Sequence, residues 1–447
     1  IFNAVTQPVR AKLRDRVTGK DSLITTEELA NYNIIVLDQA FRDRSYITLT
    51  NTNVLRNGHE RDANVTAVDL ALYNKKNEYA FFLQPRYSKI FGQNPYDGFT
   101  NYIEFAKVSG RFQFSLNNNI ESDKYDPNDL GILQAPNEMV NEAEFSYNIY
   151  QPTKRFLNQY YNLEIRQSYL YKPMVYQRTE IVTSAMVIFK NFWDLRLEFS
   201  TAPTWYNDYF ELQTPSDPRA TPRVGLKRSP YYFTGLSGSS DSRKRLFARW
   251  NFGFAQGPLP ADPYTIVGLG GRYRFSDRLT VDLYVERQHD NGQFGFSFRR
   301  DVNDAPILGR RKYTDLTSLL TGSYSFTPRM NLTFRARHYW NKLKYTNLYD
   351  VNSDGYWTER FDRRPSDFDV NYNTYSLDVF YTWDFRLGSR IIIGWKNWLG
   401  RDFEYHVDGK NDLYMSNLEQ VFNNPHGNEV TIRFIYYLDY LQLRKRK

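Results

Sequence analysis

Hydrophobic and polar residues alternate along most of this chain, most clearly between residues 313 and 346. Two alternating runs flank a tight turn at residues 326–329. One face of the second run carries Met330, Leu332, Phe334, Ala336, His338 and Trp340. The other face carries Asn331, Thr333, Arg335, Arg337 and Tyr339. Because successive side chains of a strand point to opposite sides, this pattern predicts a hairpin with one apolar and one polar face.

The length of these runs indicates a membrane-spanning sheet. Strands of soluble proteins usually have about 5–6 residues, whereas a transmembrane β-strand needs roughly 9–11. The same alternation returns at residues 193–200, 279–286, 374–383 and 430–438. We therefore expect an all-β fold, a transmembrane antiparallel up-and-down β-barrel. The alternative is a soluble antiparallel sheet with one solvated face, but the apolar faces of that sheet would need a covering layer.

Composition fits a barrel and excludes a helical membrane protein. The mean hydropathy is −0.65, and no apolar run reaches the length that a membrane helix needs. Only every second strand residue of a barrel faces lipid, so a barrel tolerates this value. Aromatic residues make up 17% of the chain, which suits strands and interfacial girdles.

Short turns with aromatic neighbours recur along the chain. They lie at residues 41–46, 73–77, 108–112, 151–156, 189–193, 239–243, 275–278, 326–329 and 385–389. Longer polar segments lie between them, at Thr18–Leu29, Phe91–Gly98, Glu121–Glu138, Tyr206–Val224, Lys344–Val370 and Arg401–Asn428. Outer-membrane barrels combine short periplasmic turns with long extracellular loops. A tenth short turn, expected near Arg300–Asp304, gives about 22 strands, and 20 stays open because residues 292–312 show no clear pattern.

The chain divides into one barrel at residues 1–443 and a basic tail at residues 444–447, which read Arg-Lys-Arg-Lys. No linker or shift in composition separates further domains. The first residues do not form a charged segment followed by an apolar one, as a signal peptide would. We expect either that a leader was removed or that upstream sequence is missing.

The net charge of +8 and the absence of cysteine narrow the function classes. Without cysteine there is no disulfide framework, thiolate nucleophile or cysteine zinc site. The arginines fall on the polar faces of strands, so we expect a charged lumen and no nucleic-acid partner. The candidate lumen charges are Arg166, Arg196, Arg249, Arg272, Arg274, Arg335, Arg337, Asp194, Glu198, Asp282, Glu286 and Asp378. Charged rings of this kind select permeants in pores; a lumen that is simply solvated or cross-linked by ion pairs is the alternative.

One segment resembles half of a calcium loop. Asp350, Asn352 and Asp354 precede a glycine as in D-x-N-x-D-G, where alternate oxygens converge on a hard cation. Phe361 occupies the twelfth position, where a bidentate glutamate is expected. Calcium is therefore the one candidate cofactor, and otherwise we expect none.

Recognisable catalytic motifs are missing from the sequence. The five histidines show no H-x-x-x-H spacing, and there is no nucleophile elbow or P-loop. His338 shares the apolar face with Trp340, which favours an interfacial role over a ligand role. We expect that the protein is not an enzyme, although a Ser-His-Asp site assembled across strands stays an alternative.

Several stretches resemble the Bacteroidota outer-membrane family DUF5916, a domain of unknown function. They are YDPNDLGIL at 125–133, YNDYFELQTPSDPR at 206–219, SDSRK at 240–244, ILGRRKYTDLTSLLTGSYSF at 307–326 and LTFRARHYW at 332–340. The resemblance implies a large outer-membrane barrel, often preceded by a periplasmic domain similar to a family 9 carbohydrate-binding module, and we expect that this upstream domain is missing from this chain. It implies no catalytic residue.

Our leading hypothesis is an integral outer-membrane channel or passive transporter for polar solutes. Its expected partners are outer-membrane lipid and lipopolysaccharide. The alternative is a structural or assembly subunit of a larger outer-membrane complex, with other outer-membrane proteins or surface lipoproteins as partners. An outer-membrane hydrolase and a plugged, energy-coupled transporter are further alternatives. The sequence leaves open which permeant or partner is involved and whether the lumen is plugged.

Overall fold

Long antiparallel strands make up most of the computed structural model, which describes residues 1–16, 18–42, 44–58, 61–212, 224–258, 263–399 and 413–439. The first half contains β1 (Phe2–Thr6), β2 (Val9–Arg14), β3 (Asp21–Glu27), β4 (Ala30–Ala40), β5 (Tyr46–Arg56), β6 (Asp62–Tyr73), β7 (Tyr79–Phe91), β8 (Tyr96–Lys107), β9 (Phe112–Glu121), β10 (Glu138–Ile149), β11 (Phe156–Leu170), β12 (Val175–Phe189), β13 (Asp194–Ala202) and β14 (Tyr206–Asp208). The second half contains β15 (Leu226–Arg228), β16 (Tyr231–Ser239), β17 (Leu246–Gln256), β18 (Tyr264–Arg274), β19 (Leu279–Arg300), β20 (Pro306–Thr327), β21 (Met330–Val351), β22 (Trp357–Arg360), a 3₁₀ turn (Pro365–Phe368), β23 (Val370–Arg386), β24 (Ser389–Leu399), α1 (Tyr414–Asn423) and β25 (His426–Ile435).

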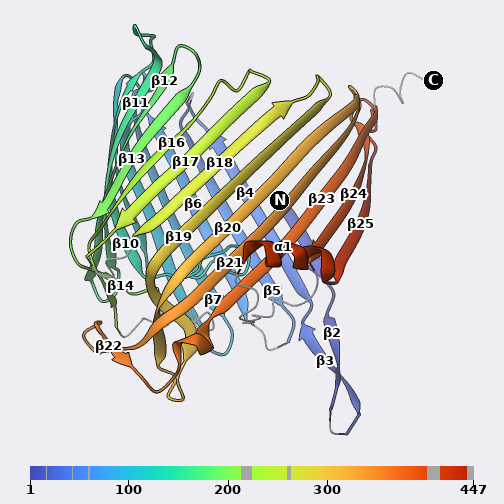
Figure 1. The fold of residues 1–447 in the computed structure, drawn as a ribbon. Coiled ribbons are helices and arrows are strands. Elements are labelled where there is room, and N and C mark those ends of the chain that lie inside the picture. The colour runs from blue at the N-terminus through green and yellow to red at the C-terminus, as the bar shows by residue number, and fades with distance from the viewer. Residues whose placement is uncertain are drawn as a thin grey trace.

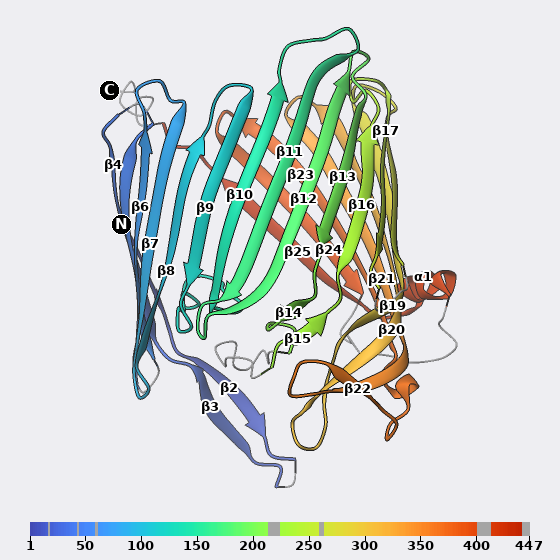
Figure 2. The same cartoon turned by 90° about the vertical axis from the view of Figure 1, so that its left-hand side faces the viewer.

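One 21-stranded antiparallel sheet curls into a barrel, as predicted (Figures 1 and 2). Strand β1 pairs with β4, and each later wall strand pairs with the next up to β13, which pairs with β16. The succession continues to β21, which pairs with both the short β22 and β23, and ends at β25. No ladder joins β25 to β1 or β4 within the described ranges. The short pairs β2–β3 and β14–β15 stand apart from the wall.

The nine short turns written out in the sequence all occur and lie at one end of the barrel, at the top of Figure 1. The tenth turn, expected near Arg300–Asp304, is wrong in its placement. Strands β19, β20 and β21 each run for 22 residues, so residues 301–305 turn the chain at the opposite end. Without the short β22, the wall has 20 strands, the lower of the two predicted counts.

The outward face of the wall carries an apolar band. Alternate side chains that point away from the barrel are exposed, such as Leu37 at 61%, Leu197 at 51% and Ile432 at 72%. The exposed aromatic residues Phe41, Phe326 and Trp383 mark its edge near the short turns. A soluble protein would cover such a surface, whereas lipid accepts it.

Carboxamide side chains replace the apolar ones on the outward face toward the loop end. On β4 the outward positions change from Leu37 to Asn33, and Asn33 is level with Asn53 on β5, which is level with Asn64 on β6. The Asn118 amide donates to Asn141 across β9 and β10 at 2.9 Å. The apolar band therefore has an aromatic edge on one side and a polar edge on the other, as a bilayer boundary requires.

Beyond this band the loop end has small hydrophobic cores of its own. The loop-end halves of β20 and β21 bury Ile307, Tyr345 and Leu348 with Phe368 from the 3₁₀ turn. A second cluster joins Leu226 of β15, Phe296 and Leu308. These cores explain how strands of 22 residues stay ordered past the length that a membrane needs.

The loop predictions need four corrections. The segment Thr18–Leu29 contains β3. The segment Phe91–Gly98 holds only a four-residue turn at residues 92–95, because β7 ends at Phe91 and β8 begins at Tyr96. The segment Lys344–Val370 begins inside β21 and contains β22. Helix α1, which was not predicted, lies in Arg401–Asn428, a segment whose start is outside the described residues, as is the basic tail. Of the helices in the described ranges, none has the length and apolar character to cross a membrane.

Candidate functional site

The interior face of β8–β12 is strongly acidic. Its inward positions carry Glu104, Glu121, Glu138, Glu142, Glu144, Glu164 and Glu180. The strand register brings several of these together, since Glu142 is level with Arg166 and Glu144 is level with Glu164. We call this wall the acidic sector. Alternation puts these residues inside because their neighbours along each strand belong to the apolar band.

Two arginines partly neutralise the acidic sector. The Arg166 guanidinium donates to Glu142 from Nε at 2.9 Å and from Nη2 at 2.8 Å, and its Nη2 also lies 3.5 Å from Glu164. Arg178 lies 3.4 Å from Glu180, whose carboxylate also accepts the Tyr231 hydroxyl at 2.6 Å. Glutamates still outnumber arginines there, so the sector is negative overall.

The predicted lumen charges on β13–β19 form local pairs. Arg249 of β17 makes a two-pronged pair with Asp282 of β19, at 2.8 and 2.6 Å. Its guanidinium also lies 5.0 Å from the centre of the Tyr284 ring. Arg196 bonds Glu198 at 3.1 Å. Asp194 of β13 accepts the Ser239 hydroxyl of β16 and so cross-links two neighbouring strands, whereas Glu286 accepts the Tyr284 hydroxyl within β19.

Arg272 and Arg274 lie at the short-turn end of the interior. Arg272 donates to the backbone carbonyl of Ser242, and Arg274 donates to those of Ser242 and Arg243 at 3.2 Å. Both side chains therefore hold the turn between β16 and β17. The same turn contains Asp241, whose pKa is held at about 2 by hydrogen bonds from Arg243.

Arg335, Arg337 and Asp378 differ from the other predicted charges. Arg335 is level with Asp378, which is level with Lys396. Neither arginine makes an ion pair with another described residue, and Asp378 makes none either. Both arginines are exposed. The inward positions of β24 and β25 add Lys396 and Arg433, together with Glu429, which is level with Lys396. Positive charges still outnumber negative ones on this side, which we call the basic sector. Figure 2 shows β23–β25 behind β9–β12, so the acidic and basic sectors lie on opposite walls.

The segment at residues 122–137, which joins β9 to β10, folds onto the interior face at the loop end, and we call it the first mouth loop. The backbone N–H of Asp126 donates to Ser88 Oγ at 3.0 Å, and Ser88 is fully buried on the inward face of β7. The loop crosses Gly98 so closely that an added Cβ would lie 2.2 Å from the Tyr125 nitrogen. Burial raises the pKa of Tyr125.

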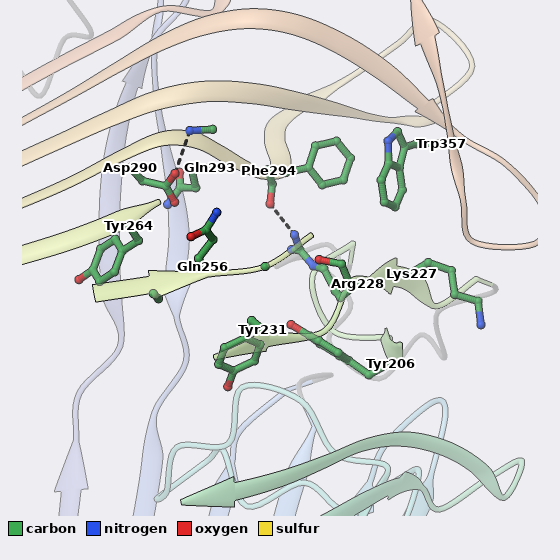
Figure 3. A pocket seen from close by; sticks show the side chains of 14 residues that line it. Tyr206, Lys227, Arg228, Tyr231, Gln256, Tyr264, Asp290, Gln293, Phe294 and Trp357 are labelled. Carbon is green, nitrogen blue, oxygen red and sulfur yellow. Dashed lines mark hydrogen bonds between the residues drawn. The ribbon is translucent and has the colours of Figure 1, made fainter. Parts of the chain in front are cut away.

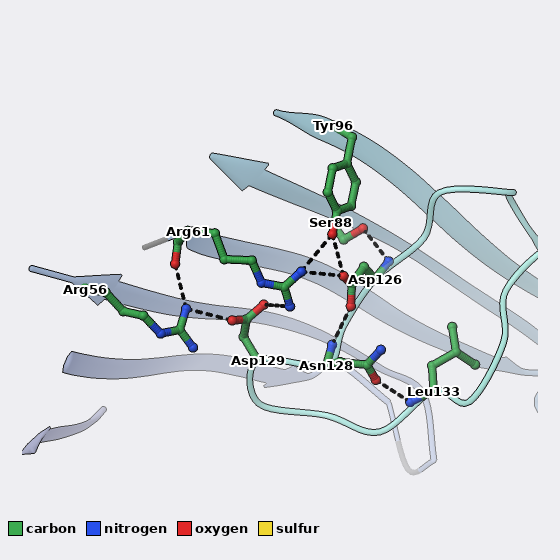
Figure 4. Close-up of polar contacts among 8 residues, drawn as sticks. All are labelled: Arg56, Arg61, Ser88, Tyr96, Asp126, Asn128, Asp129 and Leu133. Atoms are coloured by element: carbon green, nitrogen blue, oxygen red, sulfur yellow. Dashed lines mark hydrogen bonds and ion pairs between the residues drawn. The ribbon is translucent and has the colours of Figure 1, made fainter. Parts of the chain in front are cut away.

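Ion pairs hold the first mouth loop (Figure 4). Arg61 contacts Asp126 and Asp129, each at 2.9 Å, and Arg56 contacts Asp129 at 2.8 Å. The two carboxylates are only 5% and 6% exposed. The Tyr96 hydroxyl donates to Asp126 at 2.7 Å. Two aspartates of the loop are therefore clamped to β5, β6 and β8.

The segment at residues 203–230, described except for 213–223, forms the second mouth loop. Its strands β14 and β15 lie between the front and back walls at the mouth (Figure 2). Asn207 donates to the backbone of Tyr176 at 3.0 Å, and Glu211 accepts the Phe296 N–H at 2.7 Å. The loop therefore bridges from β12 to β19, and Leu226 anchors it by packing against β19 and β20.

A pocket of about 240 Å³ lies between the second mouth loop and the interior wall (Figure 3). Phe294 and Trp357 lie together there, with ring centres 4.6 Å apart. Arg228 enters the pocket, but it donates to the Phe294 carbonyl and lies 3.5 Å from Glu211. The pocket is thus aromatic and amide-lined, with its arginine already compensated.

The calcium-loop residues form a hairpin turn between β21 and β22. Asp350 pairs with Arg360 at 2.8 Å, Asn352 accepts the Thr358 hydroxyl, and Asp354 accepts the Tyr356 N–H. Gly355 takes a positive φ of 85°, as the turn requires. In this conformation the three side chains make hydrogen bonds and an ion pair within the hairpin. Across the described ranges, no three acidic or histidine side chains are grouped to hold a metal.

Sequence reasoning missed the mouth clamps, although their signal was present. The stretches YDPNDLGIL and YNDYFEL belong to the two mouth loops, and the first contains both clamped aspartates. The segment Glu121–Glu138 was predicted only as a long polar loop, and Arg56 and Arg61 are distant from it in sequence. The remaining part of the second stretch, residues 213–219, lies outside the described residues.

The wall and its charged interior define a large antiparallel β-barrel, and the sequence places it further. The chain belongs to the family DUF5916, a domain of unknown function, whose model matches residues 1–447. No curated protein matches the sequence.

Three solved structures are similar in outline. The copper transporter OprC has a TM-score of 0.42 at 11% identity, over 97% of this chain and 78% of its own. OccK5 (OpdH) of Pseudomonas aeruginosa has 0.37 at 12%, over 92% and 98%. CdiB from Escherichia coli has 0.29 at 10%, over 88% and 64%. These scores are too low to transfer any property of the three proteins.

Proposed function

We propose that this protein is an integral outer-membrane barrel that passes polar solutes. The observation that carries the proposal is the contrast between the two faces of one wall. Outside, an apolar band is bounded by aromatic and carboxamide edges. Inside, carboxylates and guanidinium groups line every sector. Charges cost little in a water-filled interior and about 2–4 kcal/mol at mid-membrane on the lipid side.

The separation of charge supports a selective interior. The acidic sector faces the basic sector across the barrel, so a permeant experiences a field directed from one wall to the other. The two mouth loops narrow the route at the loop end, which we assign to the cell exterior. Lipid and lipopolysaccharide are the partners that this location implies.

The test is conductance of the purified barrel in planar bilayers. The wild-type protein is expected to conduct, and Arg335→Ala combined with Arg337→Ala is expected to shift the reversal potential toward cation selectivity, because unpaired positive charge is lost. Asn331→Ala combined with Thr333→Ala is the matched control, since both residues are inward positions of the same strand and carry no charge. A barrel that stays electrically silent and takes up no solute would refute the proposal.

A second candidate function is a subunit of an outer-membrane complex. The observation that favours it is the β2–β3 hairpin, which projects beyond the mouth (Figures 1 and 2). Almost every residue of the hairpin is exposed, including Leu13 and Leu23. An isolated two-stranded hairpin is only marginally stable in water. Proteins that co-purify from native membranes at a fixed ratio would support this function, and a barrel that purifies alone would oppose it.

A further inference from the structure

Helix α1 lies on the outside of the barrel, against the outward face of β21 and β23 (Figures 1 and 2). The Tyr414 hydroxyl lies 3.2 Å from His338 Nδ1, and the Tyr414 ring packs against the rings of His338 and Trp340. Val421 is 1% exposed at the other end of the helix. One side of the helix is therefore fixed to the wall.

A buried polar network joins the helix to the wall. Asn417 is fully buried, and its side-chain and backbone oxygens accept hydrogen bonds from Asn371 at 2.9 Å and Asn373 at 2.7 Å. Asn373 in turn bonds His338 at 2.8 Å. Polar groups on a lipid-facing wall are costly unless they are satisfied within the protein. The helix satisfies them where the wall changes from apolar to polar.

The opposite side of the helix is uncovered and largely apolar. Met415 is 64% exposed and Phe422 is 81% exposed, whereas Leu413, which is 69% exposed, precedes the first helical residue in an extended conformation. Glu419 lies between Met415 and Phe422 on the same side, because residues three and four apart share a helix face. A helix face with large apolar side chains and one carboxylate suits a boundary between an apolar phase and water.

The height of the helix identifies that surface. His338 follows Met330 by eight residues of a tilted strand, which raises it about 20 Å above the short turn. The apolar band of an outer-membrane barrel is about 25 Å tall. On the short-turn side of the helix, Tyr375 and Leu377 continue the outward apolar row of β23.

We propose that α1 is an interfacial helix, with Met415 and Phe422 seated among the headgroups and upper acyl chains of the outer leaflet. The occupant of this face is a lipid surface, because the face is continuous with the apolar band. Glu419 keeps the helix at headgroup level. This inference rests on the membrane location proposed above.

The test is the depth of single nitroxide labels in bilayers. The chain has no cysteine, so Phe422→Cys, Leu197→Cys and Leu23→Cys each give one labelling site. Labelled barrels are reconstituted in phosphatidylcholine–phosphatidylglycerol vesicles. Collisions with oxygen, which enriches in lipid, are then compared with collisions with a water-soluble nickel chelate. Leu197 reports the centre of the band, and Leu23 on the projecting hairpin reports water.

The expected oxygen-to-nickel ratio at position 422 is several-fold higher than at 23 and lower than at 197. A ratio at 422 equal to that at 23, with 197 deep, overturns the helix assignment but leaves the membrane location standing. Water-like ratios at both 422 and 197 overturn the membrane location itself. A label at 422 shielded from both reagents shows protein contact, such as a second copy of the chain, and also overturns the assignment.

Discussion

The two mouth loops occupy the same end of the barrel but are held by different forces. Ion pairs of Asp126 and Asp129 with two arginines clamp the first loop to the wall. The burial of Leu226 holds the second, together with hydrogen bonds to the β19 backbone in which the Phe296 N–H donates to Glu211 and Arg228 donates to the Phe294 carbonyl. Ion pairs respond to salt and to loss of one partner, whereas apolar burial responds to lost volume. The two mouth loops should therefore open under different conditions.

The largest expected effect is that of Leu226→Ala. Leu226 is 0% exposed and packs on Phe296 and Leu308, so truncation leaves a cavity. We expect a loss of about 3 kcal/mol of local stability. Hydrogen exchange should speed up in the peptides around β14 and β15 and stay unchanged in residues 122–137.

The matched control is the same truncation in the first loop. Leu130 is 43% exposed, so Leu130→Ala should change exchange in neither loop appreciably. Equal effects of the two truncations would show that apolar burial holds both loops, contrary to the difference described here.

Asp129→Asn is expected to have the next largest effect, confined to the first loop. The change leaves Arg56 and Arg61 facing a neutral amide in a poorly solvated place. The cost is about 2 kcal/mol of local stability, since a charged hydrogen-bond partner is removed. The rate of amide hydrogen exchange in residues 122–137 measures this loss of local stability. Asp123→Asn is the control within the same loop, because Asp123 meets Lys172 at 3.6 Å in a pair whose lysine is largely exposed.

High salt should separate the two loops without any mutation. Raising the ionic strength from about 0.1 M to 1 M shortens the Debye length from about 10 Å to 3 Å. The clamp of Arg61 with Asp126 weakens, so exchange in the first loop should rise modestly, while burial of Leu226 is unaffected. Single-channel recordings at the two salt concentrations would report opening of the first loop as a second measurement. A fall in protection of the second loop alone would contradict this account.

Sequence pattern predicted the wall because alternation is local. The inward and outward faces of β13 and β21 follow from period two alone, and the structure keeps both. The tenth short turn was misplaced because β19 continues to Arg300, and that continuation depends on a core that Phe296 of β19 forms with the distant Leu226. Helix α1 was missed because it is short and its wall side includes the polar Asn417.

The sequence could predict which charged residues face the interior, but it could not predict which of them form ion pairs. Alternation indicated that Arg249 and Arg335 face the interior, but it could not show that the first is paired and the second is not. Pairing depends on which strands are neighbours and on their register, which the sequence does not state. The clamp of Arg61 on Asp129 joins residues 68 positions apart, which no local pattern connects.

The smallest expected effect is at the opposite end, where an ion pair closes a turn rather than a loop. Hydrogen bonds from Arg243 lower the pKa of Asp241 to about 2, against about 3.9 for an unfolded aspartate. Because the folded value is the lower one, the stabilisation is complete above about pH 4 and disappears as the pH falls toward 2. Exchange of the peptide spanning the turn should therefore gain an acid-dependent component only below about pH 4. Asp241→Asn should abolish that component and leave both mouth loops unchanged. A turn in the wild-type protein that already loosens at pH 5 would show that a group other than Asp241 controls it.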